Sequence, residues 1–400
     1  MALEIRPARP EEMEEFKSIP ATVFLPPPAE RSEVPMRPEW TLCAFEDGRL
    51  ATSYAAWPLT MRFNGKGVSA AGVTEIGTRP VYRRRGHLRK ITTAHFELLH
   101  ERGEQPLAIL YASQAAIYHR FGYAVVSMFN EYSIEPRYLQ FALVRPGTGA
   151  VREAGDDEFE LFKDLYRRFC AERTGYIHRS KITWEAGVLA SPPKGGVLSR
   201  VIYEEAGEPL GYIIYAVEPH PVRKSTGPWQ QLFVRDLVWL TASAFQAAWN
   251  SLASMDLVRN IKCRAPEDDP LPHLLAEPRM LHSTSYDGLL ARIVDIEKVL
   301  PERGFQEEGV LTFEILDDLC PWNQGRWKLE TSAAEASITP TGEEPDLVMP
   351  ISTLALLVFG QISATEAARM GRLDVLKPDA LPLWDRVMRT KYRPFCADQF

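Results

Sequence analysis

The chain has 400 residues, of which 45% are hydrophobic and 25% charged, and its formal net charge is −7 at pH 7. This length exceeds what one hydrophobic core usually serves, so we expect two or three globular domains. The acidic balance argues against general nucleic-acid binding, which needs a basic domain or a broad basic face.

The cysteines and the apolar stretches indicate where such a protein works. The five cysteines are scattered and include no CxxC pair, which argues against a metal site or a disulfide framework and favours a reducing compartment. The charged N-terminal stretch has no apolar run of signal-peptide length, and no stretch approaches the length of a membrane span. We therefore expect a cytoplasmic protein with no membrane span and no metal.

The first part of the chain mixes strand and helix signals. Residues 3–19 are typical of a short strand followed by an acidic helix, and the proline-rich stretch 20–40 is typical of an irregular loop beside a cleft. Apolar and polar residues then alternate through residues 41–79 around Asp47-Gly48 and Asn64-Gly65. Because Asp-Gly and Asn-Gly are strong hairpin signals, this stretch predicts three antiparallel strands.

Helical periodicity replaces the alternation after the third strand. Apolar spacing predicts a helix that ends at Gly103, and the continuously apolar stretch 106–112 predicts a buried strand. A short helix ended by Gly122 and further strand follow. Together these elements predict an α+β unit of about 140 residues.

Two further units follow the first. From about Val151 the chain repeats the order helix, hairpin, strand and helix, but without arginines and a glycine between strand and helix. A third region contains a strand pair and the apolar stretch 350–360, which predicts a helix. We therefore predict an α+β protein with domains at 1–145, 146–288 and 289–400.

Positive charge is concentrated between the third strand and the helix of the first unit. Gly86 lacks a Cβ, so backbone can approach a ligand closely there. Free N–H groups at a helix start and the helix dipole both favour an anion. Arg84, Arg85 and Arg89 can add charge-assisted hydrogen bonds to phosphate oxygens. The turn is therefore a candidate phosphate cradle, and the alternative is a solvated basic turn.

This arrangement resembles a known superfamily. An R-R-x-G after a strand, followed by a buried strand and "IYHRFGY", resembles the GNAT acyltransferases, in which R/Q-x-x-G-x-G/A binds acetyl-CoA. Here Leu88 takes the place of the second small residue. In addition, "RPVYRRRGHLRK", "ASQAAIYHRFGYAVVS", "PEDDPLPHLL", "DGLLARIVDIEKVLPERGF" and a C-terminal Phe occur in this order. Together they are similar to the Eis-type (enhanced intracellular survival) N-acetyltransferases over essentially the whole chain.

The resemblance implies an architecture and a cofactor site. The expected order is a GNAT catalytic domain, a degenerate GNAT-like domain and a sterol-carrier-like α/β domain, assembled as a homohexamer of two stacked trimers. The co-substrate is acetyl-CoA. The implied contacts are the backbone of Ile76, Gly77 and Thr78 for the pantetheine arm, the loop Arg84, Arg85, Gly86, His87, Leu88 and Arg89 for the diphosphate, and Ser113 and Gln114 for a further contact. Ile76 is also typical of core strand, and Ser113 of a helix N-cap.

The resemblance also implies two catalytic groups. Tyr118 matches the general acid, since a phenol of pKa about 10 stays protonated at neutral pH and can donate to a thiolate of intrinsic pKa about 8.5. The terminal carboxylate of Phe400 matches the general base, folded back into the first domain; the alternative is a frayed chain end. Tyr123 is the competing tyrosine and is expected to pack. His95 is expected to be a packed residue, and His119 is a reserve candidate for proton handling.

The predicted activity is acetyl transfer from acetyl-CoA to primary amines of a polycationic acceptor, either an aminoglycoside-like small molecule or a lysine side chain. Glu75 stands where the family has an apolar or aromatic residue; it either attracts an ammonium group or pairs with an arginine. Asp268 and Asp269 are expected to form a turn. Two alternatives remain: a hydrophobic-ligand carrier, in which the helix at 350–360 lines a pocket rather than the core, and a CoA-binding scaffold with a vestigial acetyltransferase site.

Overall fold

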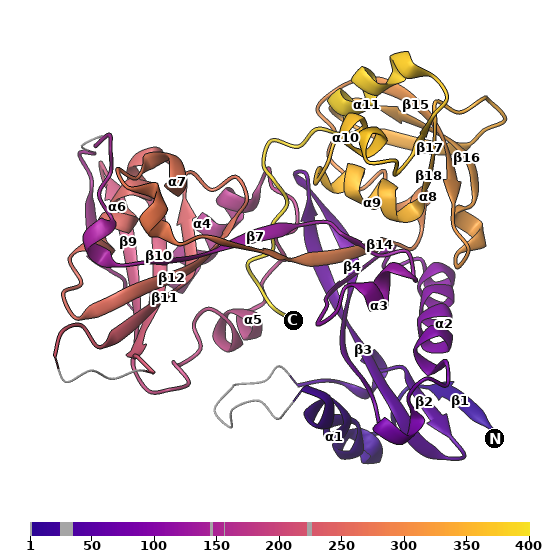
Figure 1. Ribbon diagram of the computed structural model, residues 1–400, viewed down its shortest axis with the longest axis horizontal. Helices are drawn as coiled ribbons and strands as arrows, with labels where there is room; N and C mark the ends of the chain where they lie inside the picture. Colours follow the sequence, from indigo (N-terminus) through magenta and orange to yellow (C-terminus); the bar gives the residue numbers. More distant parts are fainter. Residues whose placement is uncertain (1, 25–34, 145–146, 156, 222–225) are drawn as a thin grey trace.

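Three β-sheets organise the chain (Figure 1). The structure is a computed structural model and describes residues 2–24, 35–144, 147–155, 157–221 and 226–400. Within these residues the first two sheets have seven strands each and the third has five. The first two units lie side by side, and the third lies against the first.

The first sheet has the strand order β1-β2-β3-β4-β5-β14-β6. As predicted, Asp47-Gly48 and Asn64-Gly65 form tight turns, all four residues have positive φ, and the strands that they join are antiparallel. The helix that follows β4 ends at Gly103, which has the left-handed conformation, and this end is also as predicted. The elements of this unit are β1 (Leu3–Arg6), α1 (Met13–Phe24), β2 (Cys43–Glu46), β3 (Arg49–Phe63), β4 (Lys66–Thr78), α2 (His87–Arg102), β5 (Leu107–Tyr111), α3 (Ala116–His119) and β6 (Ala124–Val125), joined by β14 (Leu289–Ile293).

The first helix is longer than the sequence indicated. We expected an irregular loop from residue 20, but α1 continues through Pro20 to Phe24. Its buried face, which includes Phe16 and Ile19, packs on the first sheet, and this burial outweighs the hydrogen bond that proline removes. The rest of the expected loop includes residues 25–34, which lie outside the described part of the chain.

The second sheet has the strand order β13-β7-β12-β11-β10-β9-β8. The predicted hairpin, strand and helix of this unit are confirmed, with the hairpin turning at Ala206-Gly207. The elements are β7 (Met128–Ile134), β8 (Ala150–Glu153), α4 (Phe159–Cys170), α5 (Lys181–Ala186), β9 (Val197–Glu205), β10 (Glu208–Pro219), β11 (Gln230–Trp239), α6 (Ala242–Ala253), β12 (Val258–Pro266), α7 (Leu271–Leu274) and β13 (Thr284–Asp287).

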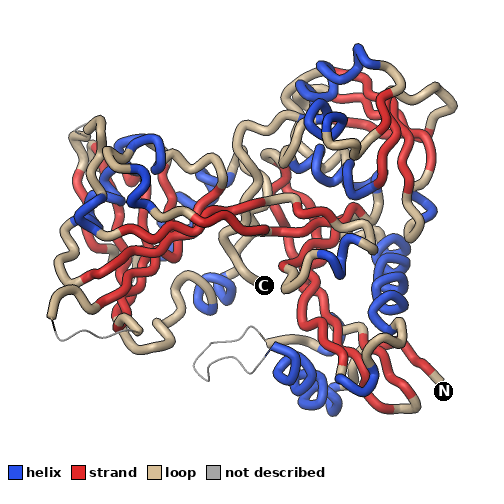
Figure 2. The backbone as a smooth tube through the Cα atoms, in the orientation of Figure 1, coloured by secondary structure: helices blue, strands red, loops and turns tan. Residues whose placement is uncertain are grey.

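One antiparallel ribbon joins the two sheets. Residues 124–131 pair with residues 284–291 in continuous register, so that β6 and β14 lie in the first sheet and β7 and β13 in the second. Figures 1 and 2 show this ribbon crossing between the units. At the crossing, the Ser127 hydroxyl accepts a hydrogen bond from the N–H of Leu289 at 2.8 Å. The first sheet therefore contains a strand that follows the second unit in sequence, and the chain divisions at 145/146 and 288/289 stay predictions.

The third unit is a five-stranded sheet with the order β17-β16-β15-β18-β19. The apolar helix predicted at 350–360 is α9, and all its residues except Ser352 are buried. It packs between the third sheet and strands β6 and β14, so these contacts favour the core interpretation over a lipid pocket. No helix of the described residues is long and apolar enough to cross a membrane. The elements are α8 (Ile296–Val299), β15 (Gly309–Leu316), β16 (Gly325–Thr331), β17 (Ala336–Pro340), β18 (Leu347–Pro350), α9 (Ile351–Phe359), α10 (Ala364–Arg369), β19 (Asp374–Val375) and α11 (Leu381–Met388).

Candidate active site

Strands β4 and β5 separate in the middle of the first sheet. Their parallel pairing ends at Gly72 and Ile109, while β4 continues to Thr78 and, among the described strands, pairs there with β3. A bulge at Glu75, whose φ is 55°, interrupts the pairing of β4 with β3. Bulges of this kind re-aim backbone groups and are common beside active sites. Beyond Gly72, the described strand that pairs with β4 is therefore β3.

The predicted pantetheine contacts lie on this part of β4. Ile76 and Thr78 are half-buried, and Gly77 is buried beneath α1. A Cβ at Gly77 would lie 2.9 Å from the side chain of Ile19, so glycine allows the helix to approach the strand closely. Ile76 is thus a half-buried strand residue that packs against the core, and its backbone contact with pantetheine stays a prediction.

The turn before α2 has the geometry of an anion site. Gly86 is the N-cap of α2, has a φ of 80°, and provides no side chain to cap the helix. The N–H groups in the first helical turn, at His87, Leu88 and Arg89, have no acceptor within the helix. Arg84 and Arg89 are exposed, and an added Cβ at Gly86 would meet nothing within 4 Å. The helix-start backbone donors and two exposed arginines therefore belong to the same turn.

Arg85 and His87 have a different position in this turn. The guanidinium of Arg85 donates to the carboxylate of Glu46 and, at 2.9 Å, to the carbonyl of Val81. The Nε2 atom of His87, a buried residue, lies 3.0 Å from the same carboxylate. These two side chains hold the turn on β2, so we expect their contribution to anion binding to come from backbone and from indirect positioning.

The second sheet repeats the strand order but not the anion site. The helix after β11 begins at Thr241, whose hydroxyl accepts a hydrogen bond from the N–H of Ala244 at 3.1 Å. A side chain therefore already satisfies a donor that is left open at Gly86. No arginine stands in the segment from Leu240 to Ser243. Of the two corresponding turns, only the one in the first unit is built to receive an anion.

The last residue of the chain lies where β4 and β5 separate. The ring of Phe400 is 5.5 Å from that of Tyr111, the last residue of β5. A Cβ at Gly72 would lie 3.0 Å from the Phe400 ring, so glycine leaves room for this ring on the sheet. In the tail, Phe395, Cys396 and Asp398 are buried, whereas Gln399 is exposed.

Tyr118 lies on the short helix that follows β5. Its side chain is half-buried, with its ring 5.9 Å from that of Tyr123, and burial raises the pKa of its phenol. The phenol is therefore protonated at neutral pH and can act as a donor. Tyr123 is fully buried, as expected for a packing residue. Ser113 and Gln114 are exposed between β5 and α3; the N-cap of this helix is Ala115, so the N-cap interpretation of Ser113 was wrong.

The remaining titratable candidates have structural partners. The Nδ1 atom of His95 lies 2.7 Å from the Tyr54 hydroxyl, and burial lowers the pKa of His95 to about 4. The Nδ1 atom of His119 lies 3.1 Å from the carbonyl of Tyr123. Asp268 accepts from the N–H of Arg393 at 2.9 Å, and Asp269 accepts from the N–H of Leu271 at 3.0 Å. The two aspartates thus stabilise loops, as predicted.

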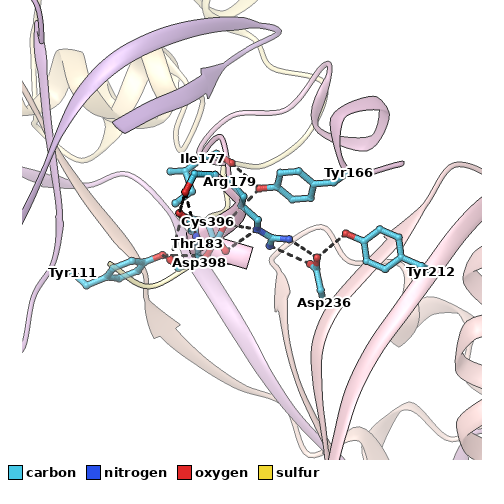
Figure 3. Close-up of polar contacts among 10 residues, drawn as sticks. Tyr111, Tyr166, Ile177, Arg179, Thr183, Tyr212, Asp236, Cys396 and Asp398 are labelled. Carbon is cyan, nitrogen blue, oxygen red and sulfur yellow. Dashed lines mark hydrogen bonds and ion pairs between the residues drawn. The ribbon is translucent and has the colours of Figure 1, made fainter. Parts of the chain in front are cut away.

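Sequence reasoning missed the residues that hold the C-terminal tail. Tyr111 donates its hydroxyl to the carbonyls of Cys396 and Asp398, at 3.1 and 2.8 Å. Arg179 of the second unit binds the side chain of Asp398, and Figure 3 shows these contacts. No local pattern identifies a buried arginine whose partner is more than 200 residues away, so the sequence carried no signal for it.

Comparison with known proteins agrees with this geometry. Two family models described as acetyltransferase (GNAT) domains match residues 4–126 and 175–293, and a sterol carrier protein domain matches residues 296–397. An uncharacterised N-acetyltransferase of Streptomyces avermitilis is 30% identical over 79% of this chain and 78% of its own length. The N-acetyltransferase Eis of Mycobacterium tuberculosis is 29% identical over 76% of this chain and 74% of its own.

Solved structures share the whole architecture. Eis1 from Mycobacterium abscessus has a TM-score of 0.83 at 27% identity, and each chain is covered completely. A GCN5-related N-acetyltransferase from Anabaena variabilis has a TM-score of 0.87 at 21% identity, also over both complete chains, and supports the fold alone. The predicted combination of two GNAT units and a sterol-carrier-like unit is confirmed, and the GNAT fold implies acetyl-CoA as co-substrate. The chain therefore belongs to the Eis-type N-acetyltransferases of the GNAT superfamily.

Proposed function

We propose that this enzyme acetylates primary amines where β4 and β5 separate, with the terminal carboxylate of Phe400 as general base and Tyr118 as general acid. The position of Phe400 is the observation that carries the proposal. Its ring lies against Gly72 and Tyr111. This part of the sheet is next to the strand residues that are predicted to contact pantetheine. A chain end that only frayed into solvent would have no need of this packing.

The binding of acetyl-CoA would be shared between two regions of the first unit. The strand backbone of Ile76 to Thr78 would offer hydrogen-bond donors and acceptors to a pantetheine arm; of these groups, the Thr78 carbonyl already accepts from Nε of Arg83 at 3.2 Å. The helix-start amides, with the guanidinium groups of Arg84 and Arg89, suit a diphosphate. Ser113 and Gln114 are exposed at the end of β5 and would add a contact. Bound acetyl-CoA supplies the thioester carbonyl that the amine attacks.

The two catalytic groups have complementary proton roles. An ammonium group must lose a proton before it can attack, and the Phe400 carboxylate is an acceptor for that proton, directly or through water. The departing thiolate needs a proton, and burial keeps the Tyr118 phenol protonated as a donor. Both groups come from residues next to β5, since Tyr118 follows this strand and Tyr111, which ends it, contacts Phe400.

We propose a cationic amine as acceptor, either an aminoglycoside-like small molecule or a lysine side chain. Trp57 of β3 lies opposite Gly72, and its ring is 5.2 Å from that of Trp40. Aromatic rings attract cations, and the Phe400 carboxylate adds negative charge on the same sheet. The homohexamer stays a prediction from the resemblance, and the cytoplasmic location stays a prediction from the cysteines and the charged N-terminal stretch.

An amine-panel assay tests this proposal. The enzyme would be incubated with acetyl-CoA and aminoglycosides, polyamines or lysine peptides, with detection of free thiol and of the acetylated amine by mass spectrometry. We expect thiol release in equal amount to amide formation, and none with the same acceptors after their amines are blocked. Acetyl-CoA binding without turnover of any amine would instead support a scaffold. Binding of an apolar probe without acetyl-CoA binding would support a carrier.

A further inference from the structure

The second sheet separates at the same place as the first, and a buried ion pair lies on the strand that continues past this point. Parallel pairing of β11 with β12 ends at Val234 and Cys263, and β11 continues to Trp239. Asp236 lies on this continuation and is buried, as is Arg179, which precedes α5. The strand of the second unit that corresponds to the proposed pantetheine strand of the first therefore carries a buried ion pair.

Arg179 connects β11 of the second sheet to the C-terminal tail (Figure 3). Its Nε atom donates to both carboxylate oxygens of Asp398, at 2.8 and 3.0 Å, and its Nη atoms donate to Asp236. The Tyr212 hydroxyl donates to Asp236 at 2.7 Å, and the Tyr166 ring centre lies 4.0 Å from the Arg179 guanidinium carbon. One guanidinium therefore bridges a carboxylate of the sheet and a carboxylate of the tail.

Charge makes this bridge depend on the tail. Burial opposes the positive charge of Arg179, but Asp236 and Asp398 outweigh burial and raise its pKa well above the ordinary value. Breaking a buried ion pair is costly because the remaining charge loses its partner without regaining water. When Asp398 leaves, Nε of Arg179 loses both of its acceptors. The network is therefore complete only with the tail docked.

The first unit holds the backbone of the same residue. The Tyr111 hydroxyl, at the end of β5, donates to the carbonyl of Asp398 at 2.8 Å. The side chain of Asp398 is thus bound by the second unit and its carbonyl by the first. Only Gln399 separates Asp398 from Phe400, and two residues span at most about 7 Å. Anchoring Asp398 from both units therefore restricts where the terminal carboxylate can lie.

We propose that Arg179 is a positioning residue for acetyl transfer and that the second GNAT unit serves as the anchor of the C-terminus. Arg179 binds Asp236 of β11 and also holds Asp398, two residues before Phe400, and so restricts the position of the Phe400 carboxylate. The inference rests on the proposed function, since it gives the anchor a purpose only if the Phe400 carboxylate acts in transfer. It explains why the second unit keeps the sheet without the anion site.

The experiment compares Arg179→Met, Arg179→Lys and Asp398→Asn with the unaltered full-length enzyme. A matched control is Arg152→Met, because Arg152 also bridges two carboxylates of the second unit, Glu158 and Glu204, but does not touch the tail. One readout is the rate at which a carboxypeptidase selective for aromatic residues releases Phe400. The other is the separation of kcat from KM for acetyl-CoA.

We expect Arg179→Met and Asp398→Asn to speed release of Phe400 by at least about threefold, because local opening becomes easier. We expect kcat to fall by about tenfold to a hundredfold, as for a misplaced catalytic group, with KM for acetyl-CoA within about twofold. Arg179→Lys should give smaller changes, since lysine keeps the positive charge but lacks the planar, paired N–H donors of the guanidinium. Arg152→Met should change neither readout.

A C-terminal extension of a few residues separates failure of this inference from failure of the proposed function. If the extension abolishes turnover while Asp398→Asn leaves both kcat and the release rate unchanged, the proposed anchoring role of Arg179 is wrong. The proposed role of the Phe400 carboxylate as general base is then retained. If the extension leaves turnover intact, the Phe400 base is wrong and the positioning role falls with it. Asp398→Asn is nearly isosteric and lies in the tail, so it keeps the test decisive even if Arg179→Met does not fold.

Discussion

Replacing Arg84 and Arg85 separately by alanine should have different effects, although the two residues are neighbours. Arg84 is exposed and has a free approach to a diphosphate, whereas Arg85 is bound to Glu46. A charged hydrogen bond contributes about 1.5–3 kcal/mol, and exposure favours the lower end. Arg84→Ala should therefore weaken CoA binding about tenfold, with little change in the free energy of unfolding.

Arg85→Ala should act mainly on stability. Glu46 is only 6% exposed, and without Arg85 its carboxylate retains His87 as its remaining neighbour. Leaving a buried acceptor short of a partner costs about 1–3 kcal/mol. Because Arg85 itself is part-exposed, we expect the free energy of unfolding to fall by about 1–2 kcal/mol. CoA affinity should fall by less than in Arg84→Ala.

Calorimetric titration with CoA and urea unfolding measure the two effects. Arg102→Ala is the matched control, because Arg102 is exposed at the opposite end of the same helix and should change neither quantity. If Arg85→Ala lost tenfold in affinity at unchanged stability while Arg84→Ala lost nothing, the assignment of roles within the turn would be refuted.

Three further predictions concern catalysis and pH. Tyr118→Phe should lower kcat about a hundredfold with KM for acetyl-CoA nearly unchanged, while Tyr123→Phe stays active in the same assay; the reverse pattern would reassign the acid. Gly72→Val should displace the side chains of Leu59 and Phe400, which an added Cβ would approach to 2.5 and 3.0 Å, and lower kcat at least about tenfold, while calorimetry finds CoA affinity unchanged; full activity would mean that the position of Phe400 does not matter. The pKa of His95 is about 4 in the folded protein, below its ordinary value, so stability is complete above about pH 6.5 and falls as pH drops toward 4. Urea unfolding at pH 7 and pH 5 should show a loss about 2 kcal/mol larger than in His95→Gln, and equal losses would contradict a buried neutral imidazole.

Local signals account for the parts of the fold that the sequence predicted. Asp-Gly and Asn-Gly turns at residues 47–48 and 64–65 define the hairpins, and Gly103 ends the helix, because each position needs a positive φ that few residues adopt. The turn at Gly86 was recognisable from its run of arginines and from a glycine directly before a helical pattern. The prediction at Pro20 was wrong because a buried helix face outweighed a local helix breaker.

Long-range pairing accounts for what the sequence could not predict. The strand Leu289–Ile293 joins the first sheet, although it follows the whole second unit in the chain. Its apolar residues would suit the centre of any of the three sheets, so composition does not select one. Arg179 and Asp398 look like ordinary surface residues in sequence, and only the fold brings them together in a buried pair.

The site depends on the turn around Gly86 holding the diphosphate of coenzyme A, and a structure of the complex with CoA tests this most directly. The diphosphate should contact the backbone N–H groups of His87 to Arg89 and the guanidinium of Arg84, with the pantetheine arm between β4 and β5. A nucleotide bound in the second sheet, or anywhere else with the Gly86 turn empty, would contradict the assignment.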